Sequence, residues 1–190
     1  MILAWKVRWS MELPPCCKSL LLALLIIGAT TSGPAWGAPG AFLQPGQPAP
    51  ICQLSDLQDS PRQFPISGRW NIIFFWSLFC HTCLEEIPLL IKETVRRQHD
   101  CEAVFVSLDT KRMQKAVGNF LEKRHLQAQV LMEEVASSSY LTADLWGVKT
   151  TPSVFLIDPN GKVIFSREGP FSLEELFSGF SPTSTAIETA

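Results

Sequence analysis

Two cysteines separated by two residues carry the strongest chemical signal in the sequence. Cys80 and Cys83 lie in the stretch Cys-His-Thr-Cys, shortly after an apolar run. Such a pair can alternate between a dithiol and a disulfide, because this spacing brings both sulfurs within bonding range in the first turn of a helix. The free N–H groups and positive dipole end of that helix favour a thiolate. We therefore expect an exposed Cys80 to attack a partner's disulfide, and a shielded Cys83 to resolve the mixed disulfide.

Other uses of a cysteine pair fit the sequence less well. A structural zinc site usually takes two close pairs of ligands, whereas Cys52 and Cys101 are isolated. Covalent haem attachment needs a histidine directly after the second cysteine, and that residue is Leu84. A purely structural disulfide and an iron–sulfur cluster on all four cysteines remain as lesser alternatives. We therefore predict no metal or cofactor, only a redox-active disulfide between Cys80 and Cys83.

The elements that position the pair can be predicted from hydrophobic patterning. Residues 70–76, WNIIFFW, form a continuous apolar run that is typical of a central strand buried on both faces. From Cys80 to about Gln98, apolar residues recur at steps of three and four, which predicts a helix. A buried strand, a loop and a helix in this order place a catalytic group at the carboxyl end of a sheet.

Strands and helices alternate along the rest of the chain. Further strands are predicted over residues 51–57, 62–66, 102–108, 130–132, 153–157 and 162–166, and further helices over 111–124, 136–146 and 172–180. This alternation predicts an α/β sandwich with parallel strands in the middle and an antiparallel edge added late in the chain. Cys52 and Cys101 could form a structural disulfide that ties the N-terminal segment to the second central strand; two separate buried thiols are the alternative.

Residues 1–37 have the pattern of a secretory signal peptide. Three basic residues precede an apolar run of ten, residues 20–29, and small residues follow it, with cleavage expected after Gly37. The run is too short for a transmembrane helix, which needs about 20 apolar residues, although an uncleaved N-terminal anchor remains an alternative. We therefore expect an exported, periplasmic protein, or one that is anchored in the membrane and faces the periplasm.

The mature chain is expected to hold one domain. Residues 38–48 are rich in proline and glycine and are interpreted as a linker, residues 49–180 as the domain, and residues 181–190 as a C-terminal tail. The whole chain has 16 basic and 18 acidic residues, a formal net charge of −2. This balance excludes a strongly basic nucleic-acid surface. We expect a monomer with no nucleic-acid partner.

Three motifs give the chain a family resemblance. They are F-W-x-x-F-C-x-x-C over residues 75–83, C-x-x-C-x-x-E-x-P over residues 80–88, and GVKTTPSVFLIDPNG over residues 147–161. Together they resemble the thioredoxin superfamily and, within it, the exported TlpA/ResA-like thiol–disulfide oxidoreductases, over about residues 49–180. The resemblance implies a thioredoxin-like three-layer sandwich: a mixed sheet with helices on both faces, an N-terminal hairpin, and an extra helix and strand at about residues 111–132.

The resemblance also implies that Pro152 follows a cis peptide bond and that Thr151 faces the cysteines. Glu86 lies three residues after Cys83, on the same helical face. A carboxylate buried there would raise the pKa of the thiols and could relay a proton to Cys83; an exposed helical glutamate is the alternative. We therefore predict Glu86 as a catalytic residue beside Cys80 and Cys83.

Further residues are predicted to shape the docking surface or to tune the pair: Trp76, His81, Thr82, Thr151 and Pro152. A histidine next to the first cysteine can stabilise its thiolate, which makes a stronger oxidant, whereas Glu86 acts in the opposite direction. The sequence also departs from the family, with Phe79 where tryptophan is usual and no proline between the cysteines.

The favoured activity is disulfide exchange with protein substrates in the reducing direction, for example on apocytochrome cysteines during cytochrome c maturation. The expected partners are protein thiols or disulfides and a membrane protein that donates or accepts electrons. A disulfide-forming oxidase of the same fold is the nearest alternative. A peroxiredoxin-type peroxidase would need a threonine or serine and a proline upstream of its cysteine, and only Ser77 is present. A binding module or chaperone without redox turnover is the third class.

Overall fold

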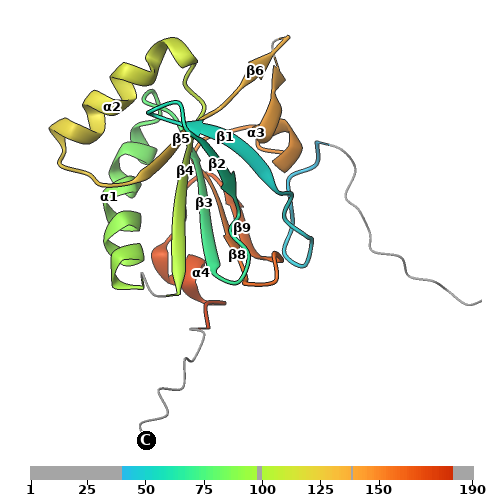
Figure 1. The fold of residues 1–190 in the computed structure, drawn as a ribbon. Helices are drawn as coiled ribbons and strands as arrows, with labels where there is room; N and C mark the ends of the chain where they lie inside the picture. The colour runs from blue at the N-terminus through green and yellow to red at the C-terminus, as the bar shows by residue number, and fades with distance from the viewer. Residues whose placement is uncertain (1–39, 98–99, 138, 182–190) are drawn as a thin grey trace, which may run out of the picture. The chain divides into compact units, whose positions relative to one another are not determined.

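The computed structural model describes residues 40–97, 100–137 and 139–181. The predicted signal peptide lies outside these residues, as does nearly all of the predicted tail. The described chain forms a seven-stranded sheet with helices on both faces (Figure 1). Within these ranges no helix combines the length and the apolar character needed to cross a bilayer.

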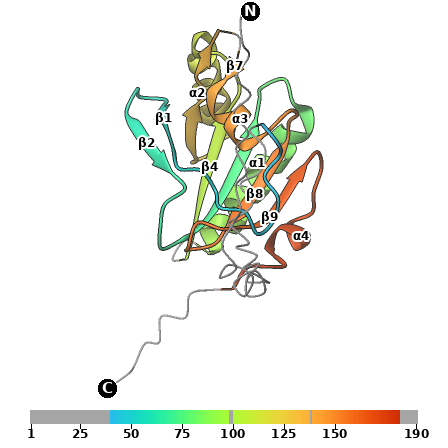
Figure 2. The same cartoon turned by 90° about the vertical axis from the view of Figure 1, so that its right-hand side faces the viewer.

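The sheet is mixed. Its strands are β1 (Cys52–Asp56), β2 (Pro61–Phe64), β3 (Trp70–Trp76), β4 (Cys101–Ser107), β5 (Gln129–Met132), β8 (Ser153–Ile157) and β9 (Val163–Glu168). They lie in the order β2-β1-β5-β4-β3-β8-β9. Strands β3, β4 and β5 are parallel, and every other pairing is antiparallel. The predicted parallel centre and late antiparallel edge are therefore confirmed, and Figure 2 shows the β1–β2 hairpin and β9 at opposite edges.

The central strand β3 is buried on both faces, as its apolar run predicts. Side chains on a strand alternate between faces. Ile72, Phe74 and Trp76 accordingly belong to the core on one side of the sheet, whereas Ile73 and Phe75 belong to the core on the other. One strand thus contributes to both apolar layers, which fixes the sheet between its helices.

The helices divide between the two faces. They are α1 (His81–Arg96), the 3₁₀ turn η2 (Lys111–Met113), α2 (Gln114–Lys123), α3 (Leu141–Trp146) and α4 (Leu173–Phe177). Helices α1, α2 and α4 bury Leu90, Val117 and Leu176 in the first core. Helix α3 buries Trp146 in the second core, together with Phe42 from the N-terminal segment. This is the three-layer sandwich that the family resemblance implies.

The predicted helix over residues 136–146 is wrong in its first half. Residues Val135–Ala136 (β6) and Ser139–Tyr140 (β7) pair as a small antiparallel hairpin, and Ser137 takes a positive φ of 50° at its turn. Helix α3 begins only at Leu141, because the buried carboxylate of Glu133 accepts the backbone N–H groups of Thr142 and Ala143 and caps the helix there. The helix ends at Gly147, as predicted.

Gly147 is required at the end of α3. Its φ is 71°, in the left-handed region, and an added Cβ would lie 2.1 Å from the carbonyl oxygen of Ala41. The N-terminal segment therefore packs directly on the end of this helix, where only glycine leaves room.

Cys52 and Cys101 do not form the disulfide that the sequence left open, and two separate buried thiols are confirmed. Cys52 packs in the core with α3 and accepts a hydrogen bond from the indole N–H of Trp146 at 3.3 Å. Cys101 packs in the other core, where burial raises its pKa to about 12. The sheet separates the two sulfurs, since they lie on opposite faces.

Candidate active site

The cysteine pair lies where β3 gives way to α1. Cys80 and Cys83 form a disulfide with an S–S distance of 1.99 Å. Cys80 is the N-cap of α1: its backbone is extended (φ −93°, ψ 98°), its carbonyl accepts the N–H of Leu84, and its sulfur accepts the N–H of Cys83 at 3.2 Å. The first sulfur therefore takes the place of an ordinary capping side chain, at the positive end of the helix dipole.

The two sulfurs differ in accessibility. Cys83 is fully buried against the core, and Cys80 is half-buried rather than freely exposed as expected. Directly before Cys80, the Phe79 side chain is 81% exposed, although phenylalanine is usually inside. A partner protein can therefore reach Cys80 but not Cys83, and it meets an apolar ring beside the reactive sulfur.

The Glu86 side chain is half-buried rather than fully exposed. One of its carboxylate oxygens, Oε2, is buried without a hydrogen-bond partner among the described residues. Burial raises the pKa of Glu86 to about 7, the charge of Glu85 adds to the rise, and a backbone hydrogen bond from Phe171 opposes it. This carboxyl can therefore gain and lose a proton near neutral pH, one helical turn from Cys83.

The residues between the cysteines lie at the surface. His81 is exposed, and its Nε2 lies 3.3 Å from Oε1 of Glu85, which is also exposed. Contacts between exposed charged groups contribute little to stability. Thr82 is half-buried. A tuning role for His81 and Thr82 stays a prediction.

The docking role that was predicted for Trp76 is wrong. Its side chain is fully buried and packs on Phe120 of α2, with ring centroids 5.6 Å apart. As the last residue of β3 it points into the helix-covered core, so a docked protein cannot touch it. Its indole N–H has no hydrogen-bond partner within the described residues, and only the predicted tuning role remains open.

The bond between Thr151 and Pro152 is cis, as the family resemblance implies. The same geometry occurs between Phe64 and Pro65, which no motif indicated. Because Ser153 pairs with Phe75 in the antiparallel β3–β8 ladder, Pro152 lies beside the end of β3 that leads to Cys80. Pro152 is buried and Thr151 is half-buried, so Thr151 is the more accessible of the two.

A residue that no sequence motif indicated also belongs to the site. Asp109 follows β4 and accepts hydrogen bonds from Ser77 and Leu78, in the loop that leads to Cys80. The sequence could have indicated Asp109 by its place directly after an apolar strand, because the carboxyl ends of neighbouring parallel strands lie together.

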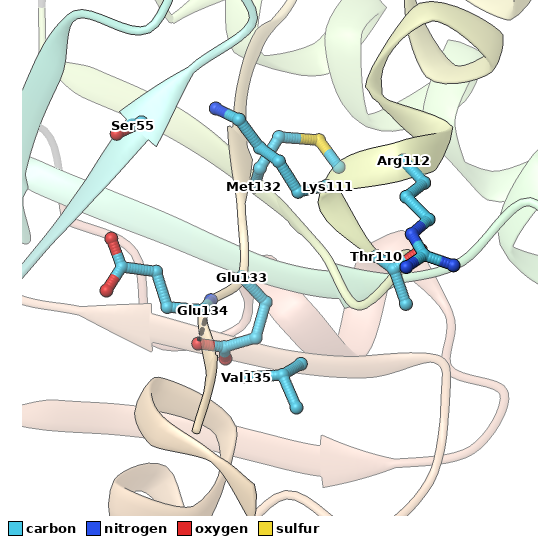
Figure 3. Close-up of a pocket in the computed structure, with 8 residues that line it drawn as sticks. All are labelled: Ser55, Thr110, Lys111, Arg112, Met132, Glu133, Glu134 and Val135. Carbon is cyan, nitrogen blue, oxygen red and sulfur yellow. Dashed lines mark hydrogen bonds between the residues drawn. The ribbon is translucent and has the colours of Figure 1, made fainter. Parts of the chain in front are cut away.

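A pocket of about 750 Å³ opens near the carboxyl ends of the parallel strands β4 and β5 (Figure 3). It is lined by Ser55, Thr110, Lys111, Arg112, Met132, Glu133, Glu134 and Val135, none of them a predicted site residue. Glu133 takes backbone hydrogen bonds from Glu134, Thr142 and Ala143, and burial raises its pKa. Its carboxylate is thus engaged in holding α3.

Within the described residues, no three acidic, histidine or cysteine side chains are grouped to hold a metal ion.

Comparisons with known proteins show the family of the chain. The AhpC/TSA family matches residues 45–166, more than half of the chain. ResA of Bacillus thuringiensis subsp. konkukian, a thiol-disulfide oxidoreductase, is 26% identical over 132 residues, covering 69% of this chain and 73% of ResA. Sporulation thiol-disulfide oxidoreductase A of Bacillus subtilis is 21% identical over 163 residues, covering 84% and 94%.

A solved structure extends the likeness to three dimensions. The Chlorobium tepidum protein described as a thiol:disulfide interchange protein DsbE superposes with a TM-score of 0.60 and 25% identity, over 70% of this chain and 91% of that one. The predicted thioredoxin-like fold and the predicted class of thiol–disulfide oxidoreductase are therefore confirmed. The structure holds a disulfide between Cys80 and Cys83, and the chain belongs to the AhpC/TSA family.

Proposed function

We propose that the chain is an exported thiol–disulfide oxidoreductase that reduces disulfides in other proteins. The observation that carries this proposal is the Glu86 carboxyl, which is partly buried, has a pKa of about 7, and lies one turn beyond the buried Cys83. A resolving thiol that is shielded from water needs a nearby group to accept its proton, and the i, i+3 spacing on α1 supports Glu86 in this role.

In the proposed reaction the reduced enzyme gives two electrons to a substrate disulfide. The Cys80 thiolate attacks one substrate sulfur, forms a mixed disulfide and releases the other substrate sulfur as a thiolate. The Cys83 thiol passes its proton to Glu86, and its thiolate attacks the sulfur of Cys80. The Cys80–Cys83 disulfide forms and the second substrate sulfur leaves as a thiolate. The two substrate thiolates then take up one proton from Glu86 and one from solvent and end as thiols. A donor dithiol then reduces the enzyme again.

Two electrostatic effects support the reducing direction, against the helix dipole and His81, which favour a thiolate on Cys80. An enzyme becomes a strong oxidant when its reduced form is stabilised, above all as a thiolate. A carboxylate beside the pair disfavours a thiolate by charge repulsion, and burial of Cys83 disfavours it by desolvation. Both effects favour the oxidised enzyme, and hence electron transfer to the substrate.

The proposed setting is outside the cytoplasm. The basic and apolar pattern of residues 1–37 supports export, to the periplasm or to a membrane anchor facing it. There, apocytochrome cysteines before haem attachment are a fitting substrate class, with a membrane protein as electron donor. N-terminal sequencing of the exported protein tests this part, since cleavage is expected after Gly37.

The reduction potential of the Cys80–Cys83 pair decides the direction. It is measured by equilibrating the protein with defined ratios of a reduced and an oxidised small thiol. A value near −270 mV, in the range of thioredoxin, is expected, whereas a value near −120 mV would establish the oxidase alternative. Consumption of hydrogen peroxide at an enzymatic rate would instead establish the peroxidase alternative.

A further inference from the structure

Asp109 links the segments that follow two neighbouring parallel strands, β3 and β4, at the carboxyl ends of these strands, where the cysteines lie. Trp76, the last residue of β3, lies opposite Ser107, the last residue of β4, so the segments that follow both strands start side by side. Asp109 Oδ1 accepts the hydroxyl of Ser77 at 2.9 Å, and Oδ2 accepts the N–H of Leu78 at 2.9 Å. A side chain after β4 thus binds the loop after β3.

The bonds of Asp109 are shielded from solvent. The residue is 4% exposed, and Oδ2 also accepts the hydroxyl of Ser107 at 2.8 Å. These donors are neutral, and none of the ion pairs among the described residues includes Asp109. Hydrogen bonds to a carboxylate are stronger than those between neutral groups. The loop before the active site is therefore held by a buried acidic group that forms no ion pair within the described part of the chain.

The constraint reaches Cys80 through Ser77. The Ser77 hydroxyl, which donates to Asp109, accepts the N–H of Phe79 at 3.2 Å. The Ser77 carbonyl accepts the N–H of Cys80 at 3.0 Å. Residues 77–80 thus form a tight turn that ends at Cys80, and this turn sets the extended backbone with which the Cys80 sulfur reaches the N–H of Cys83.

We propose that Asp109 is a positioning residue for disulfide exchange: through Ser77 and Leu78 it holds Cys80 at the N-cap of α1, where its sulfur is aligned for attack. This inference rests on the proposed function, because it concerns the same cysteine pair. Asp109 acts on Cys80 through the loop and is not itself a group that touches the substrate.

The test compares Asp109→Ala with Asp109→Asn. The rate of reduction of the Cys80–Cys83 disulfide by dithiothreitol is expected to fall about tenfold or more in the alanine variant, since small displacements of reacting groups cost up to about a hundredfold. The midpoint pH for alkylation of reduced Cys80 should also rise, because a displaced sulfur loses the helix N–H groups. Asparagine retains an oxygen for Leu78 and an N–H₂ that can donate to Ser77, so this variant should keep most of the rate.

Asp56→Ala is the matched control. Asp56 is 7% exposed and likewise holds a turn, by accepting the backbone N–H groups of Gln58 and Ser60, but that turn joins β1 to β2. The control should lower stability and leave the exchange rate and the alkylation midpoint unchanged. An equal loss of rate in Asp56→Ala would mean that the effect is global and would overturn the inference.

Other outcomes are equally decisive. A wild-type rate in Asp109→Ala overturns the inference, and so does a downward shift of the alkylation midpoint in both variants, which would indicate a role of charge alone. If the alanine variant does not fold, Ser77→Ala removes the link to Phe79 and should slow exchange in the same direction. A wild-type protein that cannot exchange at all would refute the proposed function itself, whereas an active wild type with an equally active alanine variant refutes only this inference.

Discussion

Glu86 lies one helical turn beyond Cys83 on α1, and its Oε2 is buried without a hydrogen-bond partner among the described residues. Burial raises the pKa of this carboxyl to about 7, whereas most glutamates stay ionised at that pH. Cys83 is fully buried and must lose a proton before it can attack Cys80. The helix thus carries a weak acid one turn beyond a cysteine that has no direct access to water.

The first prediction concerns Glu86→Gln. Glutamine fills the same space but cannot take up a proton, so the step in which Cys83 attacks Cys80 should slow by about a hundredfold, a usual contribution of general acid–base catalysis. Rapid-quench measurement of mixed-disulfide decay across pH should show an inflection near 7 in the wild type and none in the variant. Glu85→Gln is the control: it removes an exposed charge that adds to the rise in the pKa of Glu86, so the inflection should move to lower pH but persist.

The same substitution should alter stability in a pH-dependent way. The folded pKa of Glu86, about 7, lies above its ordinary value of 4.5, so folding favours the protonated carboxyl. Ionisation of Glu86 therefore lowers the free energy of unfolding. This loss of stability is absent below pH 4.5, grows as the carboxyl of the unfolded chain ionises, and is complete above about pH 7. Glu86→Gln removes it, so the variant should match the wild type in acid and exceed it by about 1 kcal/mol in mild alkali, after allowance for solvent screening. Urea unfolding at both pH values measures the difference, and an unchanged pH dependence would contradict the assignment.

Phe79→Ala should weaken the engagement of protein substrates. The ring is 81% exposed beside Cys80, and a docked protein would bury it. Truncation of a residue at the centre of an interface can cost a complex about 1 kcal/mol or more, or roughly tenfold in affinity, and Phe79 next to the reactive sulfur would hold such a place. The KM for a protein disulfide should therefore rise several-fold, while reduction of the enzyme by dithiothreitol stays unchanged. Leu89→Ala, on an exposed part of α1 further from the cysteines, should leave both values at the wild-type level.

Local patterns were enough to predict the frame of the site. The apolar run of β3 and the three- and four-residue spacing that follows Cys80 predicted the strand and helix that hold the pair. Because β3 and α1 follow one another directly in the sequence, their hydrophobic patterns can be interpreted without knowing which distant residues pack against them. The cis bond before Pro152 came from family resemblance alone, because physical chemistry by itself favours a trans bond.

Long-range contacts explain what the sequence could not show. Asp109 acts on a loop about thirty residues earlier, and no local pattern reveals this pairing. Glu133 caps α3 from outside the helix, so the hydrophobic spacing before Leu141 was misread as helical. Cys52 and Cys101 lie on opposite faces because of strand register, which sequence spacing does not determine.

A Cys83→Ala variant should hold its substrate covalently. Cys80 can still attack a substrate disulfide, but no second thiol is present to release the mixed disulfide. Incubation of the reduced variant with periplasmic extract should yield adducts that dissociate with dithiothreitol, and mass spectrometry would identify the partner. Cys80→Ser should give no such adducts, because the remaining Cys83 is buried. Equal adduct yields from both variants would contradict the assigned order of attack.

The two buried thiols outside the site should differ in their effect on stability. Cys52→Ala removes the sulfur that accepts the Trp146 indole N–H, and a buried donor left unsatisfied costs about 1–3 kcal/mol in addition to lost packing. Cys101→Ala removes a similar volume from the opposite core without leaving an indole N–H unpaired, and should cost about 1 kcal/mol. Denaturant unfolding of both variants measures the difference. Neither variant should change the rate at which Cys80 and Cys83 exchange with a small thiol, since the sheet separates Cys52 from the core that holds Cys83. A loss of exchange in Cys52→Ala would contradict this and show that Cys52 affects the redox pair.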